Sequence, residues 1–183
     1  IDFELSVKNP RNLKRYLESQ PVETSAPCRI DMGGTLDIRT FYSPRRPLNP
    51  LPFNIALDLR THVRLLPYDE PVVKITSTGF ESAEFPVESA PFDHPVGLMF
   101  AIAAYFQAEG VHIEIDSKSP PRSGLGGSSV AAVALIAAFS SVLTRIGVYR
   151  KLYRREIAIL AHALEESVAG VPCGLQDQLA AAY

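Results

Sequence analysis

Residues 119–139 read SPPRSGLGGSSVAAVALIAAF, and no other stretch constrains the fold as strongly. Just before it, VHIEIDS at 111–117 alternates apolar and polar residues, as a strand does. Three glycines then fall within four positions, and an apolar segment typical of a buried helix runs from about Ser128 to Arg145. This order brings free backbone N–H groups and the positive end of a helix dipole together. The stretch predicts an anion-binding loop, with a capped helix start after a tight turn as the alternative.

The loop lacks two common nucleotide-binding motifs. It has no lysine of the type found in G-x-x-x-x-G-K-[ST], and GLGGSS is not G-x-G-x-x-G, because Ser129 stands where the last glycine belongs. The glycines still allow the backbone to approach a phosphate closely, and the two serines offer hydroxyls at the helix start. The loop is therefore a phosphate-binding candidate of another type.

The rest of the chain shows a mixture of strand and helix patterns. Apolar periodicity and turn residues predict strands near 26–31 and at 54–67 and 72–79, and helices at 8–19, 95–110 and 153–168. The segment 39–52 carries four prolines in 14 residues, so we expect a surface loop there. The pattern predicts a mixed α and β domain.

Composition limits the partners of the chain. The 183 residues are 46% apolar, enough for a core, and 18 Lys and Arg nearly balance 20 Asp and Glu, so nucleic acid is not an expected partner. Cys28 and Cys173 lie far apart, which suits a reducing, cytoplasmic location. The apolar run Val130–Phe139 is shorter than the roughly 18 residues of a membrane span, so no membrane partner is expected. The chain lacks an initiator Met and ends on QDQLAAAY, so we expect a fragment of a longer protein.

The loop resembles the second motif of the GHMP kinase superfamily, P-x-x-x-G-L-G-S-S-A. This superfamily includes galactokinase, homoserine kinase and mevalonate kinase. This chain has Gly127 in place of the first serine of that motif and Val130 in place of its alanine. The resemblance implies that ATP phosphates bind the loop and that Ser128 helps to hold Mg²⁺. The implied ATP-binding residues are Pro120, Gly124, Leu125, Gly126, Gly127, Ser128 and Ser129.

Two carboxylates near the end of the chain are candidates for the chemistry of a kinase, which needs a metal site and a base. On the helix expected at 153–168, Glu165 falls at the edge of the apolar stripe and Glu166 on the opposite face, so Glu165 is the one predicted to point inward. Asp177 follows a Pro-Cys-Gly turn and is expected in a loop, where a turn or cap role is the alternative.

The segment from Glu165 to Gln178 resembles the galactokinase pattern E-x-x-x-x-G-x-P-C-G-x-x-D-Q. The resemblance implies that Asp177 is the catalytic carboxylate facing the sugar hydroxyl and that Glu165 completes the Mg²⁺ site with Ser128. Gly174, in the same segment, is assigned to the substrate side.

Near the start, SAPCRIDMGGTLDI resembles the first motif of galactokinase and of heptose kinase relatives. Arg29 matches the arginine beside the catalytic aspartate, where a fixed cation would keep Asp177 ionised and stabilise charge on the transferred phosphoryl group. Thr35 and Asp37 correspond to a Thr-Asp pair that contacts sugar hydroxyls. No Glu-His precedes them, so D-galactose is not the expected sugar.

Together the three motifs imply an α+β fold, the N-terminal domain of GHMP kinases, similar to domain 2 of ribosomal protein S5 and with a left-handed βαβ unit. Residues 1–183 are expected to form this ATP-binding domain, with a C-terminal domain of the same chain as its partner. The implied activity is ATP- and Mg²⁺-dependent phosphorylation of a sugar or sugar-phosphate hydroxyl, heptose-phosphate, fucose or galactose-like. A kinase for a mevalonate- or homoserine-type alcohol and a non-catalytic regulator that binds sugar and ATP are the alternatives.

Overall fold

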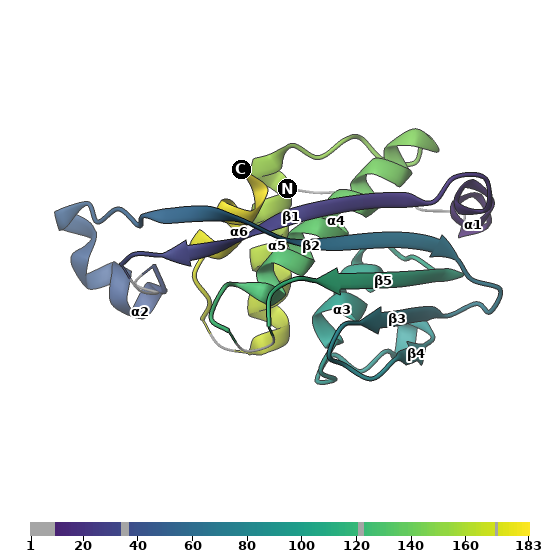
Figure 1. Ribbon diagram of the computed structural model, residues 1–183, viewed down its shortest axis with the longest axis horizontal. Helices are drawn as coiled ribbons and strands as arrows, with labels where there is room; N and C mark the ends of the chain where they lie inside the picture. The colour runs from purple at the N-terminus through teal and green to yellow at the C-terminus, as the bar shows by residue number, and fades with distance from the viewer. Residues whose placement is uncertain (1–9, 34–36, 121–122, 171) are drawn as a thin grey trace.

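A single five-stranded sheet organises the chain (Figure 1). The computed structural model describes residues 10–33, 37–120, 123–170 and 172–183. The sheet has the order β1-β2-β5-β3-β4, in which β3 and β5 pair in parallel and the other neighbours are antiparallel. Its strands are β1 Val22–Asp31, β2 Asn54–Pro67, β3 Val73–Ser77, β4 Ala83–Phe85 and β5 Val111–Ser117. The mixed sheet confirms the α+β class.

Helices cover one face of this sheet and leave the other face open (Figure 1). The central helix packs against β1 and β2, and the helix after β4 makes the crossover that joins the parallel strands β3 and β5. The principal helices are α1 Pro10–Ser19, α3 Gly97–Tyr105, α4 Gly127–Arg145, α5 Arg154–Ala169 and α6 Gln176–Ala182. The helices expected from periodicity all form, although α3 ends at Tyr105 and not at Gly110.

The central helix α4 is apolar on nearly all sides because it is surrounded by the sheet and the other helices. Among the described residues, this helix of 19 residues is long and apolar enough to span a membrane, with a mean hydropathy of 1.8 over an 18-residue window, yet 72% of that window is buried within the fold. The apolar run Val130–Phe139 is short, as the sequence indicated, and serines and a threonine extend it into one continuous helix. Its burial identifies it as the core helix.

The proline-rich segment 39–52 is not the irregular loop that its composition predicted. It contains α2, Arg39–Tyr42, followed by a 3₁₀ helix, Ser43–Leu48. Pro44 lies at the start of the 3₁₀ helix, where the N–H that proline lacks would have no helical partner, so proline is tolerated there. Together with the ends of β1 and β2 these helices form an arm, at the left of Figure 1.

Candidate active site

The glycine loop connects β5 to α4 and shapes the entrance to the site. Gly124 and Gly126 have φ of +73° and +76°, in the left-handed region that glycine adopts without steric cost. Gly126 precedes the first turn of α4, and among the described residues no side chain caps the amides of that turn. Their N–H groups and the helix dipole are therefore available to an anion, as the loop sequence predicted.

Arg29, on β1, lies beside Asp177 at the foot of this loop. Its Nε donates to Asp177 Oδ1 at 2.9 Å and its Nη2 to Oδ2 at 2.8 Å, while Nη1 donates to the carbonyl oxygen of Gly124 at 2.7 Å. The arginine is only 6% exposed, so its charge is directed to these two partners. The guanidinium of Arg29 thus links β1 to the glycine loop and to the C-terminal segment. Arg29 and Asp177, the two residues expected in the catalytic site, are in direct contact.

Asp177 lies in a helix and not in the loop that the sequence predicted. It is in the first turn of α6, directly after Gln176. Burial raises the pKa of Asp177 above its usual value, and Arg29 opposes this effect without cancelling it, while the negative charges of Asp37 and Glu165 add to the increase. A carboxylate with a raised pKa accepts a proton more readily, so this environment favours a role as general base.

Glu165, on α5, contacts the first turn of α4 from the other side. Ser128 Oγ donates to its Oε1 at 2.6 Å, and Ser129 Oγ donates to its Oε2 at 2.7 Å. The amide Nε2 of Gln178 also donates to Oε2, at 2.7 Å. The carboxylate therefore points toward the loop, as the helical period predicted for Glu165 in preference to Glu166.

The pair Ser128 and Glu165 suits Mg²⁺. Hydroxyl and carboxylate oxygens are the hard ligands that this ion prefers, and it is usually held by one or two carboxylates together with waters and substrate phosphates. In the described part of the chain no three His, Cys, Asp or Glu side chains are grouped as a metal site. The donor set thus fits an ion that arrives with a polyphosphate better than an ion bound by protein alone.

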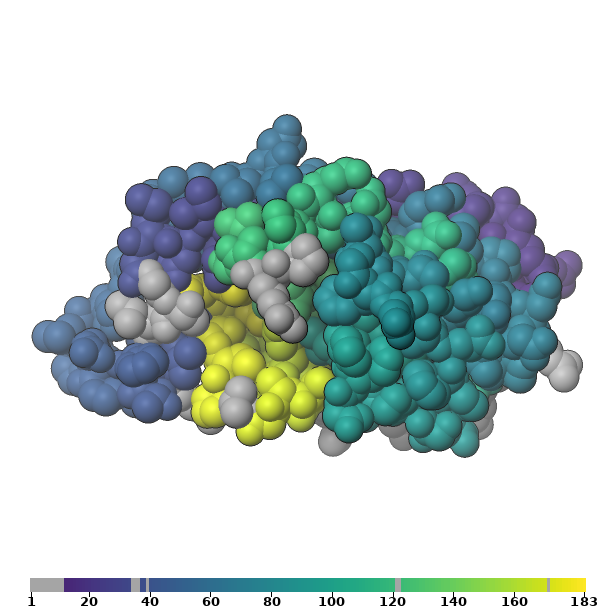
Figure 2. All heavy atoms as spheres, turned by 60° about the horizontal axis from the view of Figure 1, so that its bottom comes forward, coloured from purple at the N-terminus to yellow at the C-terminus, as the bar shows by residue number. Residues whose placement is uncertain are grey.

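A cavity of about 760 Å³ extends from the glycine loop toward α3. Figure 2 shows the green loop region above the yellow C-terminal segment, with the teal β3–α3 region beside both. At the loop, the polar end of the cavity is lined by Arg29, Pro120, Gly124, Gly126, Gly127, Ser128 and Asp177. The more apolar end, toward α3, is lined by Phe80, Pro95, Val96, Leu98 and Met99, together with Ser77 and Thr78. The size and the mixed lining of the cavity suit a nucleotide.

Two of the residues assigned to ATP lie outside this cavity. Ser129 is 4% exposed and faces Glu165, and Leu125 packs against the hydrophobic core. Leu125 also accepts a backbone hydrogen bond from the N–H of Arg29, at 3.4 Å. Ser129 and Leu125 therefore pack on the protein side of the loop, away from the cavity, whereas Ser128 lines the cavity wall.

Asp37 and Gly174 contact each other rather than the cavity. Asp37 Oδ2 accepts the backbone N–H of Gln176 at 2.8 Å, and a Cβ on Gly174 would lie only 2.0 Å from Asp37 Oδ1. Gln176 Nε2 also donates to Asp31 Oδ2, at 2.8 Å. Two residues of the first motif, Asp31 and Asp37, are thus hydrogen-bonded to Gln176 at the start of α6. Thr35, the other residue assigned to the sugar, lies outside the described residues.

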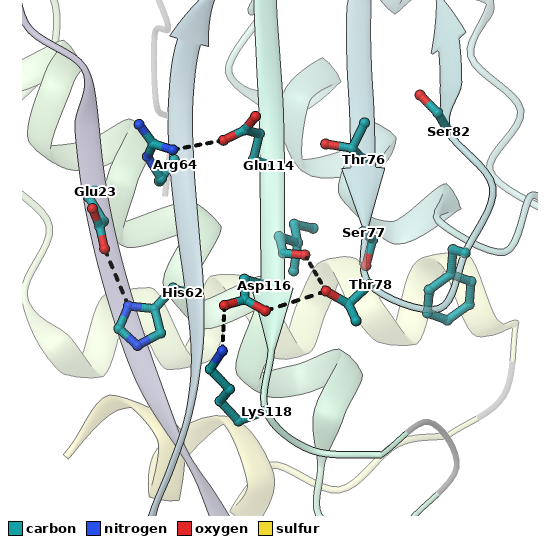
Figure 3. A pocket seen from close by; sticks show the side chains of 12 residues that line it. Glu23, His62, Arg64, Thr76, Ser77, Thr78, Ser82, Glu114, Asp116 and Lys118 are labelled. Atoms are coloured by element: carbon teal, nitrogen blue, oxygen red, sulfur yellow. Dashed lines mark hydrogen bonds and ion pairs between the residues drawn. The ribbon is translucent and has the colours of Figure 1, made fainter.

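A second concavity, of about 630 Å³, lies on the open face of the sheet (Figure 3). Its charged groups pair with one another: His62 with Glu23 and Arg64 with Glu114 across neighbouring strands, and Lys118 with Asp116 at the end of β5. Each of these side chains is at least 36% exposed, as on a solvated sheet face. The cavity at the glycine loop, where the buried pair and the free helix end meet, is the candidate active site.

Sequence reasoning missed three polar residues that connect the motifs around this site. Asp31, Gln176 and Gln178 all make side-chain hydrogen bonds across motifs that are far apart in sequence. Gln178 falls on the galactokinase pattern, but periodicity gave no reason to expect a glutamine that is only 1% exposed. Its partners lie on other helices, so no local pattern could have found them.

Comparison with known proteins agrees with this geometry. Residues 94–183 match the profile described as the GHMP kinases N terminal domain. A galactokinase from Chloroflexus aggregans is 31% identical over 190 residues, which cover 98% of this chain. The chain belongs to the GHMP kinase family, and residues 94–183 match its N-terminal domain.

Other relatives of this GHMP kinase domain differ in substrate. The D-glycero-alpha-D-manno-heptose 7-phosphate kinase of Campylobacter jejuni is 28% identical over 88% of the chain and 48% of that protein. The structure of a Lactococcus lactis galactokinase complexed with galactose shares the fold, with a TM-score of 0.66 at 19% identity over 93% of this chain and 46% of that one. The chain also covers 45% of the Chloroflexus aggregans protein, so it spans about half the length of these relatives.

Proposed function

We propose that this GHMP kinase domain transfers the γ-phosphoryl group of ATP to a hydroxyl of a sugar or sugar phosphate. The observation that carries the proposal is the buried pair of Asp177 and Arg29 on the wall of the same cavity as the glycine loop. Phosphoryl transfer requires a phosphate site, a group that orients the accepting hydroxyl, and charge stabilisation. The cavity offers residues for each of these tasks.

The nucleotide would bind with its phosphates against the loop. Backbone N–H groups at the start of α4 would donate to the phosphates, and Gly124, Gly126 and Gly127 leave room for them. The apolar end near Phe80, Leu98 and Met99 would accommodate the purine ring.

Ser128 and Glu165 would hold Mg²⁺ beside the phosphates. Bound there, Mg²⁺ would neutralise part of the phosphate charge. Glu165 contributes the negative charge of this pair, and Ser129 and Gln178 keep its carboxylate directed at Ser128.

Asp177 would act on the acceptor. Its carboxylate takes the proton of the substrate hydroxyl as the oxygen forms a bond to the γ-phosphorus, and the bond from that phosphorus to the β,γ-bridging oxygen breaks to release ADP. Arg29 would offset the charge of both the base and the transferred group. Its bond to the Gly124 carbonyl keeps the loop next to the base.

A heptose phosphate or a fucose- or galactose-like sugar is the acceptor class that the relatives favour, since these include a galactokinase and a heptose 7-phosphate kinase. We also propose that residues 1–183 form the ATP-binding half of the protein and that a C-terminal domain contributes to the acceptor site. The two cysteines, Cys28 and Cys173, lie far apart in sequence, and together with the use of ATP this fits a cytoplasmic enzyme.

The test is ADP release by the full-length protein with Mg²⁺ and ATP across heptose phosphates, fucose, galactose and mevalonate. We expect turnover on one sugar or sugar phosphate and its loss in Asp177→Asn. Turnover on mevalonate alone would overturn the acceptor class and keep the kinase. Binding of nucleotide and sugar without any ADP release would overturn the kinase and favour a regulator.

A further inference from the structure

Gln178 connects the two carboxylates of the site although it lines neither the loop nor the cavity wall. It is on α6, one residue after Asp177, and only 1% exposed. Its Nε2 donates to Glu165 Oε2 at 2.7 Å and to Ser129 Oγ at 3.3 Å. A single amide therefore links α6 with α5 and with the first turn of α4.

The orientation of this amide is fixed by the charge of its partner. An ionised carboxylate only accepts hydrogen bonds, so the Gln178 atom that lies 2.7 Å from it must be the N–H group. Gln178 Oε1 is then left buried without a hydrogen-bond partner among the described residues. An unpaired buried carbonyl is unfavourable, and the contact with Glu165 is retained in spite of it.

The two oxygens of Glu165 consequently have different surroundings. Oε2 is held by both Ser129, which is buried, and Gln178, whereas Oε1 accepts only from Ser128 in the described structure. Ser128 is exposed on the cavity wall. Gln178 therefore occupies the buried side of the carboxylate and leaves its open side facing the loop.

We propose that Gln178 is a positioning residue that sets the Glu165 carboxylate for a divalent cation and couples it to the base. The inference rests on the proposed kinase function. Adjacent residues on a helix point about 100° apart, so one turn of α6 directs Asp177 toward Arg29 and Gln178 toward Glu165. The distance between base and metal carboxylate is thereby fixed by two consecutive residues.

The neutrality of glutamine is part of this role. A lysine at position 178 would neutralise Glu165 and compete with a cation, and a glutamate would repel it. An amide orients the carboxylate by hydrogen bonding and leaves its negative charge for the ion. Outer partners of metal ligands act in this way, and their loss typically lowers metal affinity by about 10- to 100-fold.

The experiment compares Gln178→Leu with Gln176→Leu in the full-length protein. Both remove a buried amide from the same turn of α6, but Gln176 bonds to Asp31 and not to Glu165. Mn²⁺, used in place of Mg²⁺, is titrated by electron paramagnetic resonance in the presence of a non-hydrolysable ATP analogue. We expect Gln178→Leu to weaken Mn²⁺ binding about tenfold or more, and Gln176→Leu to change it by less than about twofold.

One further measurement separates positioning from packing. Thermal unfolding of the two variants reports the general cost of losing a buried amide, which we expect to be similar in both. If Gln178→Leu loses stability and binds Mn²⁺ like the unaltered protein, the positioning role is wrong.

Glu165→Gln separates this inference from the kinase proposal. If Glu165→Gln weakens Mn²⁺ binding and Gln178→Leu does not, only the role of Gln178 fails. If the unaltered protein binds no Mn²⁺ with the nucleotide analogue, the proposed function fails with it.

Discussion

Two carboxylates flank the glycine loop, and they are held by opposite kinds of partner. Asp177 receives two hydrogen bonds from the guanidinium of Arg29. Glu165 receives its hydrogen bonds from neutral groups, the hydroxyls of Ser128 and Ser129 and the amide of Gln178. Both side chains are only partly accessible to water.

The difference shows how partners decide what a carboxylate can do. The charge of Asp177 is already compensated by a fixed cation, so this group has little to offer a metal ion, and its raised pKa suits proton transfer. The charge of Glu165 is oriented but uncompensated, so the group is ready for a cation. In the proposed mechanism two identical functional groups would thus take two roles, one for the acceptor hydroxyl and the other for the metal.

The largest effect is expected when the base is neutralised. Asp177→Asn keeps the size of the side chain and an acceptor for Arg29 but cannot take a proton, so kcat should fall by about 10²- to 10⁴-fold with nucleotide affinity nearly unchanged. Steady-state ADP release and nucleotide titration measure the two quantities. Asp58→Asn, on the exposed part of β2, is the control and should keep full turnover. Full activity in Asp177→Asn would remove the base from the mechanism.

The pH profile tests the same carboxylate without a mutation. Protonated Asp177 cannot accept the hydroxyl proton, so kcat/KM should fall as pH decreases through its pKa. Because burial raises that pKa, the acid limb should lie above the ordinary aspartate value of about 3.9. A flat profile down to that value would contradict the assignment.

The next largest effect is expected on the free energy of unfolding, when the positive charge of Arg29 is removed. Arg29→Met leaves Asp177 as a partly buried charge without its partner, which should lower the free energy of unfolding by about 3 kcal/mol, near the lower limit for buried pairs since 21% of the Asp177 side chain is exposed. The loss should diminish at acid pH, where protonation of Asp177 removes the uncompensated charge. Urea unfolding of the full-length protein at two pH values measures both effects.

Arg64→Met provides the matched control for that prediction. Arg64 pairs with Glu114 on the open face of the sheet, where the two side chains are 49% and 36% exposed. Exposed pairs contribute up to about 1 kcal/mol, so this variant should lose much less stability than Arg29→Met. Equal losses would mean that the Arg29–Asp177 pair is as weak as a surface pair.

Neutralising Glu165 should have the opposite effect: little change in stability and a large change in the Mg²⁺ requirement. Glu165→Gln keeps the hydroxyl contacts but removes the uncompensated charge, so stability should change by less than about 1 kcal/mol, while the Mg²⁺ concentration needed for half-maximal ADP release should rise about tenfold or more. The neighbouring Glu166→Gln should leave the Mg²⁺ requirement as it is. A large loss of stability in Glu165→Gln, without a change in Mg²⁺ requirement, would make the carboxylate a structural group.

The two carboxylates also differ in how far sequence could predict their surroundings. The helical period placed Glu165 toward the loop, as its hydrogen bonds show, because α5 is 16 residues long. Glu166, expected on the opposite face, is half-buried like Glu165. Asp177 was wrongly expected in a loop because α6 has only seven residues and begins after Leu175, whose side chain cannot cap a helix. In the first turn of α6 the backbone N–H of Gln176 donates to the carboxylate of Asp37, which lies 139 residues earlier in the chain. When the capping side chain of a helix comes from a distant part of the chain, the sequence around the helix start does not reveal it.

The smallest effect is expected at the glycine between the two carboxylates. Gly126 has φ of +76°, and a methyl group there would lie 3.4 Å from Asp177 Oδ2 and 3.7 Å from Arg29 Nε. Gly147 has nearly the same φ, +74°, and no atom within 4 Å of such a methyl group. Alanine at either position should cost about 1 kcal/mol of stability, because both force a side chain into the left-handed region. Only Gly126→Ala should also reduce turnover, since its methyl group occupies space beside the base. Equal turnover in the two variants would show that the acceptor approaches Asp177 from another side.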